Sequence, residues 1–529
     1  MPSSHAGVRP AAVTAQGWGW RHAGRTTQAI QGLELDIRPG ERVLLLGPSG
    51  AGKSTLLHAL AGVLGEEGDD ADETGSLLVD GASPRSRRGR AGLMQQDPET
   101  QVVLSRLGDD VAFGAENLCV PREEIWTRVH EALDDVGLRT SAGGGFALDH
   151  PTSALSGGQK QRLALAGILA MRPGLVLLDE PTANLDPAGV LEVRDAVGRC
   201  LDKTGATLVV VEHRVSVWKD LVDRIVVLQP GSSAEGGSTP AVLLDGDPET
   251  VLTQARDMLT AAGVWVPAYV PATRPRSRAA DGSAVGSAVG GELLLATQDL
   301  AVSRERARRR GLKTVPPIPV QTGLDAEVLA GQALTITGPN GAGKSTFALT
   351  LAGLLAPVSG SVTAAVGLHA GVGVDPFTWK AEQLISRIGT VFQEPEHQFV
   401  TGRVLDELMF GPKHLGHGEE RVDELLERLR LSHLVDANPY TLSGGEKRRL
   451  SVATVLAAHP RVLVLDEPTF GQDANTWAEL ASFLSELLDA GTSVVSVTHD
   501  REFSSVLGGT EMRFEPAIQG SARQEAGAA

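Results

Sequence analysis

Two stretches of the chain combine closely spaced glycines with a lysine and two hydroxyl residues. The first comprises Gly47, Pro48, Ser49, Gly50, Ala51, Gly52, Lys53, Ser54 and Thr55, and the second comprises Gly338, Pro339, Asn340, Gly341, Ala342, Gly343, Lys344, Ser345 and Thr346. In a loop of this pattern, backbone N–H groups surround a β-phosphate at the positive end of the next helix, and the lysine reaches the β- and γ-oxygens. The hydroxyl after the lysine, on Ser54 or Ser345, is suited to bind Mg²⁺. The chain is therefore expected to hold two nucleoside triphosphates with their metal ions.

An apolar strand that ends in two acidic residues follows each of these phosphate loops. The acid pairs are Asp179 with Glu180 and Asp466 with Glu467. The aspartate at the strand end is expected to hold the Mg²⁺ shell, and the glutamate is expected to orient or deprotonate the attacking water. An acid pair can also simply cap a strand, but both copies continue with Pro-Thr, which favours the catalytic interpretation.

A third repeated segment places a serine and two glycines at the start of a predicted helix. The residues are Leu155, Ser156, Gly157, Gly158 and Gln159 in one copy and Leu442, Ser443, Gly444, Gly445 and Glu446 in the other. A helix N-terminus with a hydroxyl and no bulky side chain lets a γ-phosphate approach closely. With these residues the chain resembles the ATP-binding cassette (ABC) superfamily, for which Leu-Ser-Gly-Gly-Gln is the signature, and the resemblance covers both copies nearly end to end.

The resemblance implies an internal pseudo-dimer in which two ATP molecules join the two copies. Ser443 would then complete the site on Lys53, and Ser156 would complete the site on Lys344. Further positions follow the family pattern: Gln96 and Gln393 as sensors of Mg²⁺ and the γ-phosphate, His213 and His499 as switch histidines at the γ-phosphate, and Asp186 and Asp473 as loop residues that read the opposite site.

The two copies differ where the family commonly places an aromatic residue that stacks on adenine. The first copy has Trp18 and Trp20 upstream of its phosphate loop, whereas the second has Val302 and Arg304. Trp20 is a candidate for adenine stacking, although both tryptophans would also suit a packed β-region. Because both glutamates and both histidines are present, we expect two hydrolytic sites of unequal rate.

Composition limits the classes of protein to which the chain can belong. The net charge of −17 argues against non-specific binding to nucleic acid, and two cysteines among 529 residues provide no disulfide framework. The sequence has neither an apolar core of signal-peptide type near its first residues nor a run of about eighteen apolar residues. Membrane association is therefore expected to be peripheral, on the cytoplasmic side, and mediated by partners.

The spacing of the motifs indicates a tandem duplication of an α/β fold. Corresponding residues lie 286 to 291 positions apart. We predict two P-loop NTPase domains of the ABC type, each with a RecA-like α/β core, an antiparallel β subdomain and a helical subdomain. The first domain would span 1–270 and close with a helix over 250–262, a flexible linker would span 271–291, the second domain 292–514, and a disordered tail 515–529.

An acidic stretch after each glutamine resembles that of energy-coupling factor (ECF) transporter ATPases. The stretches contain Asp110 and Glu116 in the first copy and Asp406 and Glu407 in the second. Such carboxylates could bind arginines of a membrane partner, or they could form a solvated face. The resemblance implies a transmembrane scaffold and a small membrane substrate-binding subunit as partners, and a vitamin, a vitamin precursor, cobalt or nickel as solute. The alternatives are the ATPase of a conventional ABC transporter, or a soluble tandem ABC protein that acts on ribosomes or DNA.

Overall fold

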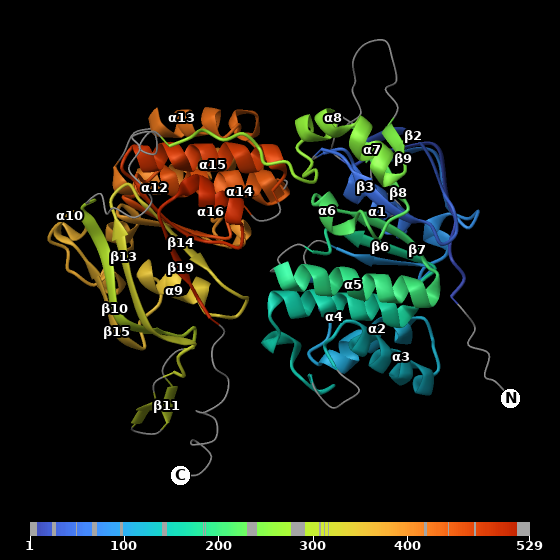
Figure 1. Cartoon of the computed structure of the whole chain (residues 1–529), viewed down its shortest axis with the longest axis horizontal. Coiled ribbons are helices and arrows are strands. Elements are labelled where there is room, and N and C mark those ends of the chain that lie inside the picture. Colours follow the sequence, from blue (N-terminus) through green and yellow to red (C-terminus); the bar gives the residue numbers. More distant parts are fainter. Residues whose placement is uncertain are drawn as a thin grey trace. The chain divides into compact units, whose positions relative to one another are not determined.

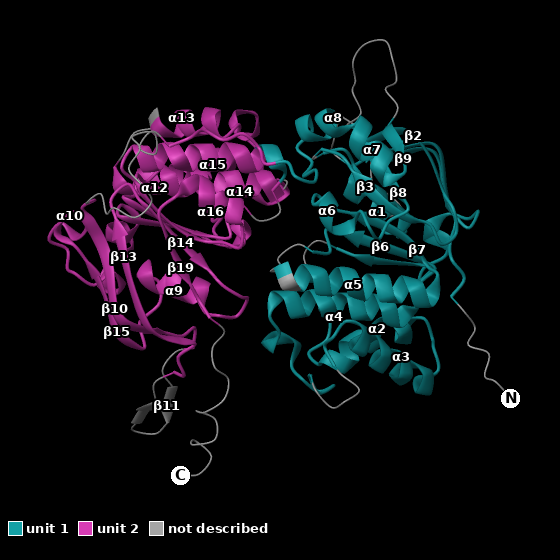
Figure 2. Cartoon of the chain, viewed as in Figure 1, with its two compact units in different colours: residues 1–269, 473–475 teal, residues 270–472, 476–529 magenta. Residues whose placement is uncertain are grey.

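The computed structural model divides the chain into two compact units, which Figure 2 shows in two colours. Unit 1 comprises residues 1–269 with 473–475, and unit 2 comprises residues 270–472 with 476–529. The predicted roles of Ser49, Gln96, Asp186 and Ser443, and the predicted tail after residue 515, lie outside the described residues. The described residues are 8–23, 28–48, 50–65, 71–95, 99–139, 145–182, 185, 187–229, 241–276, 291–305, 308–310, 313–315, 317–416, 420–442, 444–469 and 472–515.

Unit 1 alternates strands and helices (Figure 1). Its strands are β1 (Val13–Arg21), β2 (Ile30–Ile37), β3 (Arg42–Leu46), β4 (Asp72–Val79), β5 (Ala91–Met94), β6 (Leu175–Asp179), β7 (Thr207–Val211), β8 (Arg224–Leu228) and β9 (Val242–Gly246). Its helices are α1 (Lys53–Leu60), α2 (Leu107–Asn117), α3 (Arg122–Asp135), α4 (Gly157–Met171), α5 (Pro187–Thr204), α6 (Val215–Trp218), α7 (Pro248–Gln254) and α8 (Arg256–Ala261).

The core sheet of unit 1 has the order β5-β6-β7-β3-β8-β9, and only β9 runs antiparallel to its neighbour. Both faces of its central strands are buried, which explains why these strands are continuously apolar rather than alternating. Leu45 and Leu177 point to the face that α1 and the separate antiparallel sheet β2-β1-β4 cover. Leu44 and Leu178 point to the opposite face, which packs against the helical layer α2 to α5.

Unit 2 repeats this architecture with the core sheet order β16-β17-β18-β14-β19 and a second antiparallel sheet, β13-β10-β15. Its strands are β10 (Leu293–Val302), β11 (Arg308–Arg310), β12 (Lys313–Val315), β13 (Gln321–Leu329), β14 (Ala333–Thr337), β15 (Ser359–Ala364), β16 (Ile388–Val391), β17 (Val462–Asp466), β18 (Ser493–Val497) and β19 (Thr510–Arg513). Its helices are α9 (Lys344–Leu351), α10 (Val366–His369), α11 (Ala381–Ile385), α12 (Val404–Leu415), α13 (Glu420–Arg428), α14 (Gly444–Leu456), α15 (Ala474–Asp489) and α16 (Arg501–Leu507). The predicted fold class, two tandem α/β P-loop domains with antiparallel β and helical subdomains, is confirmed.

Two details differ from the sequence-based expectations. The helix expected over 250–262 is broken into α7 and α8, because Ala255 leaves the helical region at ψ 5°. The first residues of the predicted linker pack on unit 2, where Arg276 donates hydrogen bonds to Leu507 O at 3.0 Å and Gly331 O at 2.8 Å. Residues 277–290 of that linker lie outside the described part of the chain. Among the described residues, no helix combines the length and the apolar character that crossing a bilayer requires.

Candidate functional site

The two phosphate loops share their geometry in detail. Lys53 Nζ donates to Gly47 O at 2.8 Å and to Pro48 O at 3.0 Å, and Lys344 Nζ makes the same bonds to Gly338 O and Pro339 O at the same distances. Both lysines are buried. Each ammonium group is therefore held inside its loop, where the phosphates of a nucleotide are expected to bind.

Left-handed backbone conformations explain the glycines of these loops. Gly52 and Gly343 precede α1 and α9 with φ 82° and 89°. Gly50 and Gly341 have φ 81° and 78°, and no heavy atom lies within 4 Å of the position that a Cβ would take. Residues with side chains rarely adopt this conformation, so glycine is required here by the backbone rather than by packing. This backbone shape is the one in which successive N–H groups of such a loop can face a phosphate.

The serine and the aspartate among the predicted metal ligands lie together in both units, whereas no contact among the described residues places the Gln393 side chain with them. Ser345 Oγ donates to Asp466 Oδ1 at 3.0 Å, and the Asp179 carboxylate likewise accepts a hydrogen bond from Ser54. Burial raises the pKa of Asp179 to about 6 and also raises the pKa of Asp466. A hydroxyl and a carboxylate beside a phosphate loop are oxygen ligands of the type that Mg²⁺ prefers, so the residues present fit this ion. When bound, Mg²⁺ would neutralise charge on the β- and γ-phosphate oxygens.

The predicted catalytic glutamates occupy unusual backbone positions. Glu180 and Glu467 have φ 48° and 49°, in the left-handed region that non-glycine residues seldom adopt. Their N–H groups donate to Val211 O and Val497 O, in each case at 2.9 Å. These bonds tie each glutamate to the end of the neighbouring strand of the core sheet. Matched strain at two equivalent positions is typical of a functional constraint.

The switch histidines lie at these glutamates but have different partners in the two units. His213 Nε2 lies 3.0 Å from Glu180 Oε1. His499 Nε2 lies 3.5 Å from Glu467 Oε1, but it also lies 3.1 Å from both Lys344 Nζ and Asn340 Oδ1. The histidine of unit 1 is thus directed at the glutamate, whereas that of unit 2 is shared with the phosphate loop.

Burial and neighbouring charges shift the pKa of one group in each of these pairs. Burial opposes protonation of His213, but the hydrogen bond and charge of Glu180 outweigh it and raise the pKa of the imidazole. Burial, followed by the charge of Asp466, raises the pKa of Glu467 to about 8.

The signature segments begin helices as predicted. Ser156 is the N-cap of α4: its side chain accepts from Gln159 N, and Gln159 Oε1 accepts from Ser156 N at 2.9 Å. A Cβ added at Gly157 or Gly444 would meet no atom within 4 Å. Internal packing therefore does not require glycine at either position, which fits a surface that a phosphate approaches. Gly158 and Gly445 occupy the second helical positions.

Arg448 is a site residue that the sequence-based reasoning missed. Its buried guanidinium donates to Phe392 O at 2.6 Å, to Gln393 O at 2.8 Å and to Glu467 O at 3.0 Å. It therefore connects the backbone of the predicted sensor glutamine to that of the predicted base, while the Gln393 side chain is exposed. Unit 1 has the neutral Gln161 at this position, with Nε2 3.5 Å from Glu180 O. The Lys-Arg-Arg run after Glu446, which places basic residues just after the signature segment, could have indicated Arg448 as a site residue.

The adenine-stacking role predicted for Trp20 is not supported by its position. Trp20 is 3% exposed, packs in the core beneath the β subdomain, and has the Arg85 guanidinium 5.7 Å from its ring centre. The residue near the phosphate loop is His22, whose Nε2 lies 3.1 Å from Thr55 Oγ1. The packing alternative therefore describes Trp20 better, because both of its faces are covered.

Strand register identifies the counterpart of His22 in unit 2. Trp20 pairs with the first residue of β2, and Val302 pairs with the first residue of β13. His22 and Arg304 each follow two positions later. Arg304 is exposed, and its charge favours the ionised form of Asp466. The two units therefore have a histidine and an arginine at equivalent positions, and unequal binding of adenine stays a prediction.

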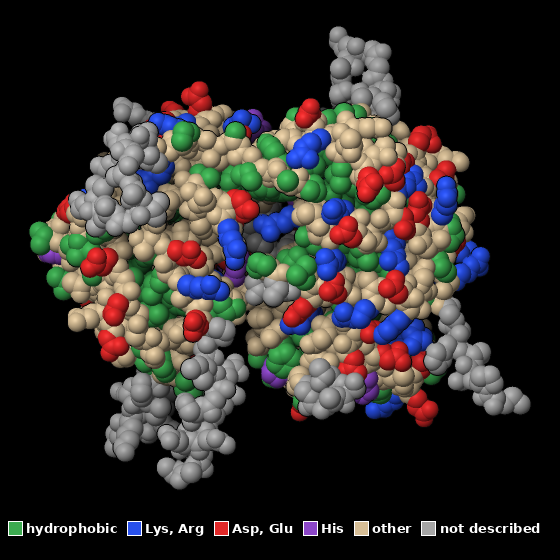
Figure 3. All heavy atoms as spheres, in the orientation of Figure 1, with side chains coloured by type: hydrophobic (Ala, Val, Ile, Leu, Met, Phe, Trp, Pro, Cys, Tyr) green, Lys and Arg blue, Asp and Glu red, His purple; other side chains and the backbone are tan. Residues whose placement is uncertain are grey.

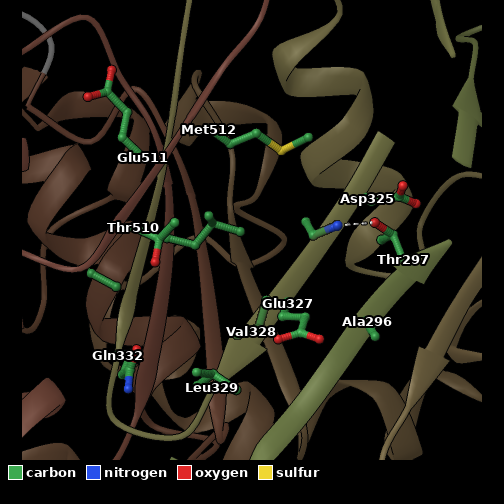
Figure 4. A pocket seen from close by; sticks show the side chains of 13 residues that line it. Ala296, Thr297, Asp325, Glu327, Val328, Leu329, Gln332, Thr510, Glu511 and Met512 are labelled. Carbon is green, nitrogen blue, oxygen red and sulfur yellow. Dashed lines mark hydrogen bonds between the residues drawn. The ribbon is translucent and has the colours of Figure 1, made fainter. Parts of the chain in front are cut away.

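A cavity of about 500 Å³ in unit 2 is separate from this chemistry (Figure 4). It lies between β10 and β13 of the antiparallel sheet and β14 and β19 of the core sheet. Thr297 Oγ1 accepts there from Ala326 N at 2.8 Å. None of the phosphate-loop, acid-pair or histidine residues lines it.

Comparison with known proteins identifies the family. The ABC transporter family matches residues 30–183 and 322–470, more than half of the chain. The chain belongs to the ABC transporter family. It is an ATPase with two ABC cassettes in tandem, of the kind that energises transport.

Two relatives match both cassettes. The chain is 34% identical over 497 residues to a protein of Bacillus subtilis (strain 168) whose provisional name is HMP/thiamine import ATP-binding protein, and the match covers 90% of this chain and 85% of the relative. It is 32% identical over 514 residues to a protein of Methanosarcina acetivorans, provisionally named an ABC transporter ATP-binding protein, and the match covers 90% of this chain and 80% of the relative.

The fold of this chain is also similar to that of a chain in a solved structure of ribosome-bound archaeal Pelota and ABCE1. The match covers 94% of this chain and 76% of that chain, with a TM-score of 0.61 and 22% identity. A likeness at this level of identity shows the fold alone.

Proposed function

We propose that this ABC ATPase energises an ECF-type importer of a vitamin, a vitamin precursor, cobalt or nickel. It would bind a transmembrane scaffold and a small membrane substrate-binding subunit at the cytoplasmic side of the membrane. Binding of two ATP molecules would close the cassettes head to tail, and hydrolysis and release would reopen them. The relative provisionally named as an HMP/thiamine import protein supports a vitamin precursor as one such solute.

The observation that carries a membrane partner is a pair of exposed apolar residues that recurs in both helical subdomains. Val103 and Phe113 are 58% and 38% exposed in unit 1, and Val400 and Phe410 are 64% and 44% exposed in unit 2. Within each unit the valine precedes the helix that carries the phenylalanine, α2 or α12. Because the same two positions are apolar and exposed in both copies, we propose that they form part of a docking site.

A carboxylate holds the loop that carries the exposed valine in each unit. Asp110 Oδ1 accepts from Val103 N at 2.8 Å and from Leu104 N at 2.7 Å. Glu407 Oε2 accepts from Val400 N at 3.1 Å and from Thr401 N at 2.8 Å. Each acid therefore holds the loop that presents the exposed valine against its helix.

This arrangement corrects the expectation that both acids bind arginines of a partner. Asp110 and Glu407 are committed to loop N–H groups, and Glu407 is only 3% exposed. Glu116 and Asp406 are exposed and remain suited to contact basic groups. We therefore propose that the partner helix binds chiefly through apolar contacts, with these two acids at the margin.

Charge on the visible face supports a protein partner rather than nucleic acid. On the face displayed in Figure 3, the described acidic and basic side chains are interspersed over each unit. Nucleic-acid binding instead favours clustered lysine and arginine. This distribution agrees with the net charge of −17.

We assign roles to the site residues as follows. Glu180 and Glu467 act as bases toward the attacking water, and His213 and His499 orient the γ-phosphate and that glutamate. Lys53 and Lys344 bind the β- and γ-phosphates, and Ser54, Asp179, Ser345 and Asp466 hold Mg²⁺. Because the histidine contacts differ, the two sites turn over at different rates.

Affinity capture from detergent-solubilised native membranes tests this function. The wild-type chain is expected to retain a multi-span scaffold and a small multi-span subunit, identified by mass spectrometry. The double variant Phe113→Glu, Phe410→Glu should lose both while keeping basal ATP turnover. Val366→Glu, which changes an apolar residue that is 78% exposed and begins α10, is the matched control and should retain them. Recovery of ribosomal or DNA-repair proteins instead would contradict the proposal.

A further inference from the structure

The threonine two residues after each proposed base is held by a carboxylate, but the carboxylate comes from a different position in each unit. In unit 1, Glu212 Oε1 accepts from Thr182 N at 3.1 Å and also from Thr182 Oγ1. Glu212 is 5% exposed and immediately precedes His213. Its side chain therefore bonds the turn behind Glu180, from a residue adjacent to the switch histidine.

In unit 2 the carboxylate follows the histidine instead of preceding it. Asp500 Oδ2 accepts from Thr469 Oγ1 at 3.1 Å and from Trp477 Nε1 at 2.7 Å. Asp500 Oδ1 accepts from Phe503 N at 2.9 Å and caps α16. One aspartate thus bonds the turn behind Glu467, the start of α15 and the start of α16.

The neighbouring positions have changed in a matching way. Thr498 occupies in unit 2 the position of Glu212, and Arg214 occupies in unit 1 the position of Asp500. Arg214 is exposed and provides no side-chain cap for α6. Val190 is the counterpart of Trp477, so unit 1 has no indole N–H that needs an acceptor there. Each unit therefore keeps one carboxylate for the threonine.

The bond to the threonine completes the restraint on the proposed base. Glu180 has its N–H bonded to Val211 O at 2.9 Å on one side and is followed by Pro181 and the anchored Thr182 on the other. A left-handed φ of 48° persists only where surrounding bonds determine it. Anchoring at both ends of Glu-Pro-Thr supplies those bonds.

We propose that Glu212 and Asp500 are equivalent positioning residues, which hold Glu180 and Glu467 in reactive orientation from opposite sides of the switch histidine. The inference rests on the proposed base role of these two glutamates. Neither Glu212 nor Asp500 touches the reacting atoms in this scheme. Each acts through the threonine, so its loss should lower kcat and leave the KM for ATP nearly unchanged.

The test exchanges the two arrangements. The kcat contributed by the site of Glu180 is the part of the turnover that Glu180→Gln abolishes. Glu212→Thr should lower this part about tenfold and should leave the KM for ATP within about twofold of wild type. Adding Arg214→Asp recreates the unit 2 arrangement and should restore kcat to within about threefold. Arg214→Asp alone is the matched control and should change little. The same test is applied to the site of Glu467 with two variants. The single variant is Asp500→Arg, and the double variant combines Asp500→Arg with Thr498→Glu.

Two results would overturn the inference. The first is an unchanged kcat in both Glu212→Thr and Asp500→Arg. The second is a kcat of both double variants that does not exceed the kcat of their single variants, although all of these variants unfold at the wild-type Tm. Glu212→Gln keeps an acceptor oxygen and should retain kcat within about threefold, so a loss equal to that of Glu180→Gln would also contradict positioning. Unchanged turnover in Glu180→Gln and Glu467→Gln would instead refute the base assignment, which separates the two failures.

Discussion

Replacement of Arg448 by alanine should destabilise unit 2 and slow its site at the same time. The Arg448 guanidinium donates to three backbone carbonyls, on Phe392, Gln393 and Glu467, from a position only 4% exposed. Hydrogen bonds from charged donors contribute about 1.5–3 kcal/mol each, and those of one group are not additive. Breaking a buried network of this kind costs about 3–5 kcal/mol in total.

Calorimetry of the purified chain measures this loss. For a domain of this size, each kcal/mol corresponds to about 2–4 °C, so Arg448→Ala should lower the Tm of one transition by roughly 6–20 °C. Arg448→Gln should cost less, because Gln161 occupies the corresponding buried position of unit 1. Steady-state ATP turnover at a temperature below the transition should also fall in Arg448→Ala, since the backbone of Glu467 loses a bond.

Lys447→Ala is the matched control for this prediction. Lys447 is the preceding residue on α14 and pairs with Glu396, whose side chain is 54% exposed. Such a pair contributes about 1 kcal/mol or less. If Arg448→Ala lowers the Tm no more than Lys447→Ala does, the reasoning from the buried carbonyl bonds is refuted.

Three further predictions concern single groups. The folded pKa of Glu467, about 8, lies above its ordinary value of 4.5, so its contribution to stability is present below about pH 4.5 and is lost as the pH rises through about 8. The Tm of Glu467→Gln minus that of wild type should therefore increase between pH 6 and pH 8.5 in thermal scans without nucleotide, and a constant difference would contradict this pKa. Iodoacetamide at pH 8 should modify the exposed Cys119 but not Cys200, because burial raises the pKa of the Cys200 thiol to about 11, and mass spectrometry of equal modification would disprove it. We propose that the His22 ring, which lies beside Thr55 of the phosphate loop, contacts the adenine of ATP. His22→Ala should then weaken ATP binding about fivefold to tenfold, because such a ring contact is worth about 1 kcal/mol, whereas Trp20→Phe should retain affinity; titration calorimetry measures both.

Much of the fold was predictable because the repeated motifs constrain local structure. The strand before each phosphate loop, the glycines with positive φ and the acids at the end of β6 and β17 are all determined by short sequences. The signature serine caps its helix through a local hydrogen-bond pattern with Gln159. Local patterns of this kind need no knowledge of distant contacts.

The features that were missed depend on contacts between distant segments. Trp20 and His22 differ by two positions, and only the contact of His22 with Thr55, 33 residues away, shows which of them lies at the phosphate loop. Arg448 reaches backbone atoms 56 and 19 residues away. The sequence predicts that Asp110 is available to a partner, whereas its carboxylate accepts a hydrogen bond from the N–H group of Val103.

The most direct test of two unequal ATP sites is the steady-state turnover of Glu180→Gln and Glu467→Gln measured side by side, with ATP binding verified in both. The different contacts of His213 and His499 predict losses of different size, so that one variant retains a clearly larger share of wild-type kcat. Equal losses, at equal ATP affinity and equal Tm, would contradict the account.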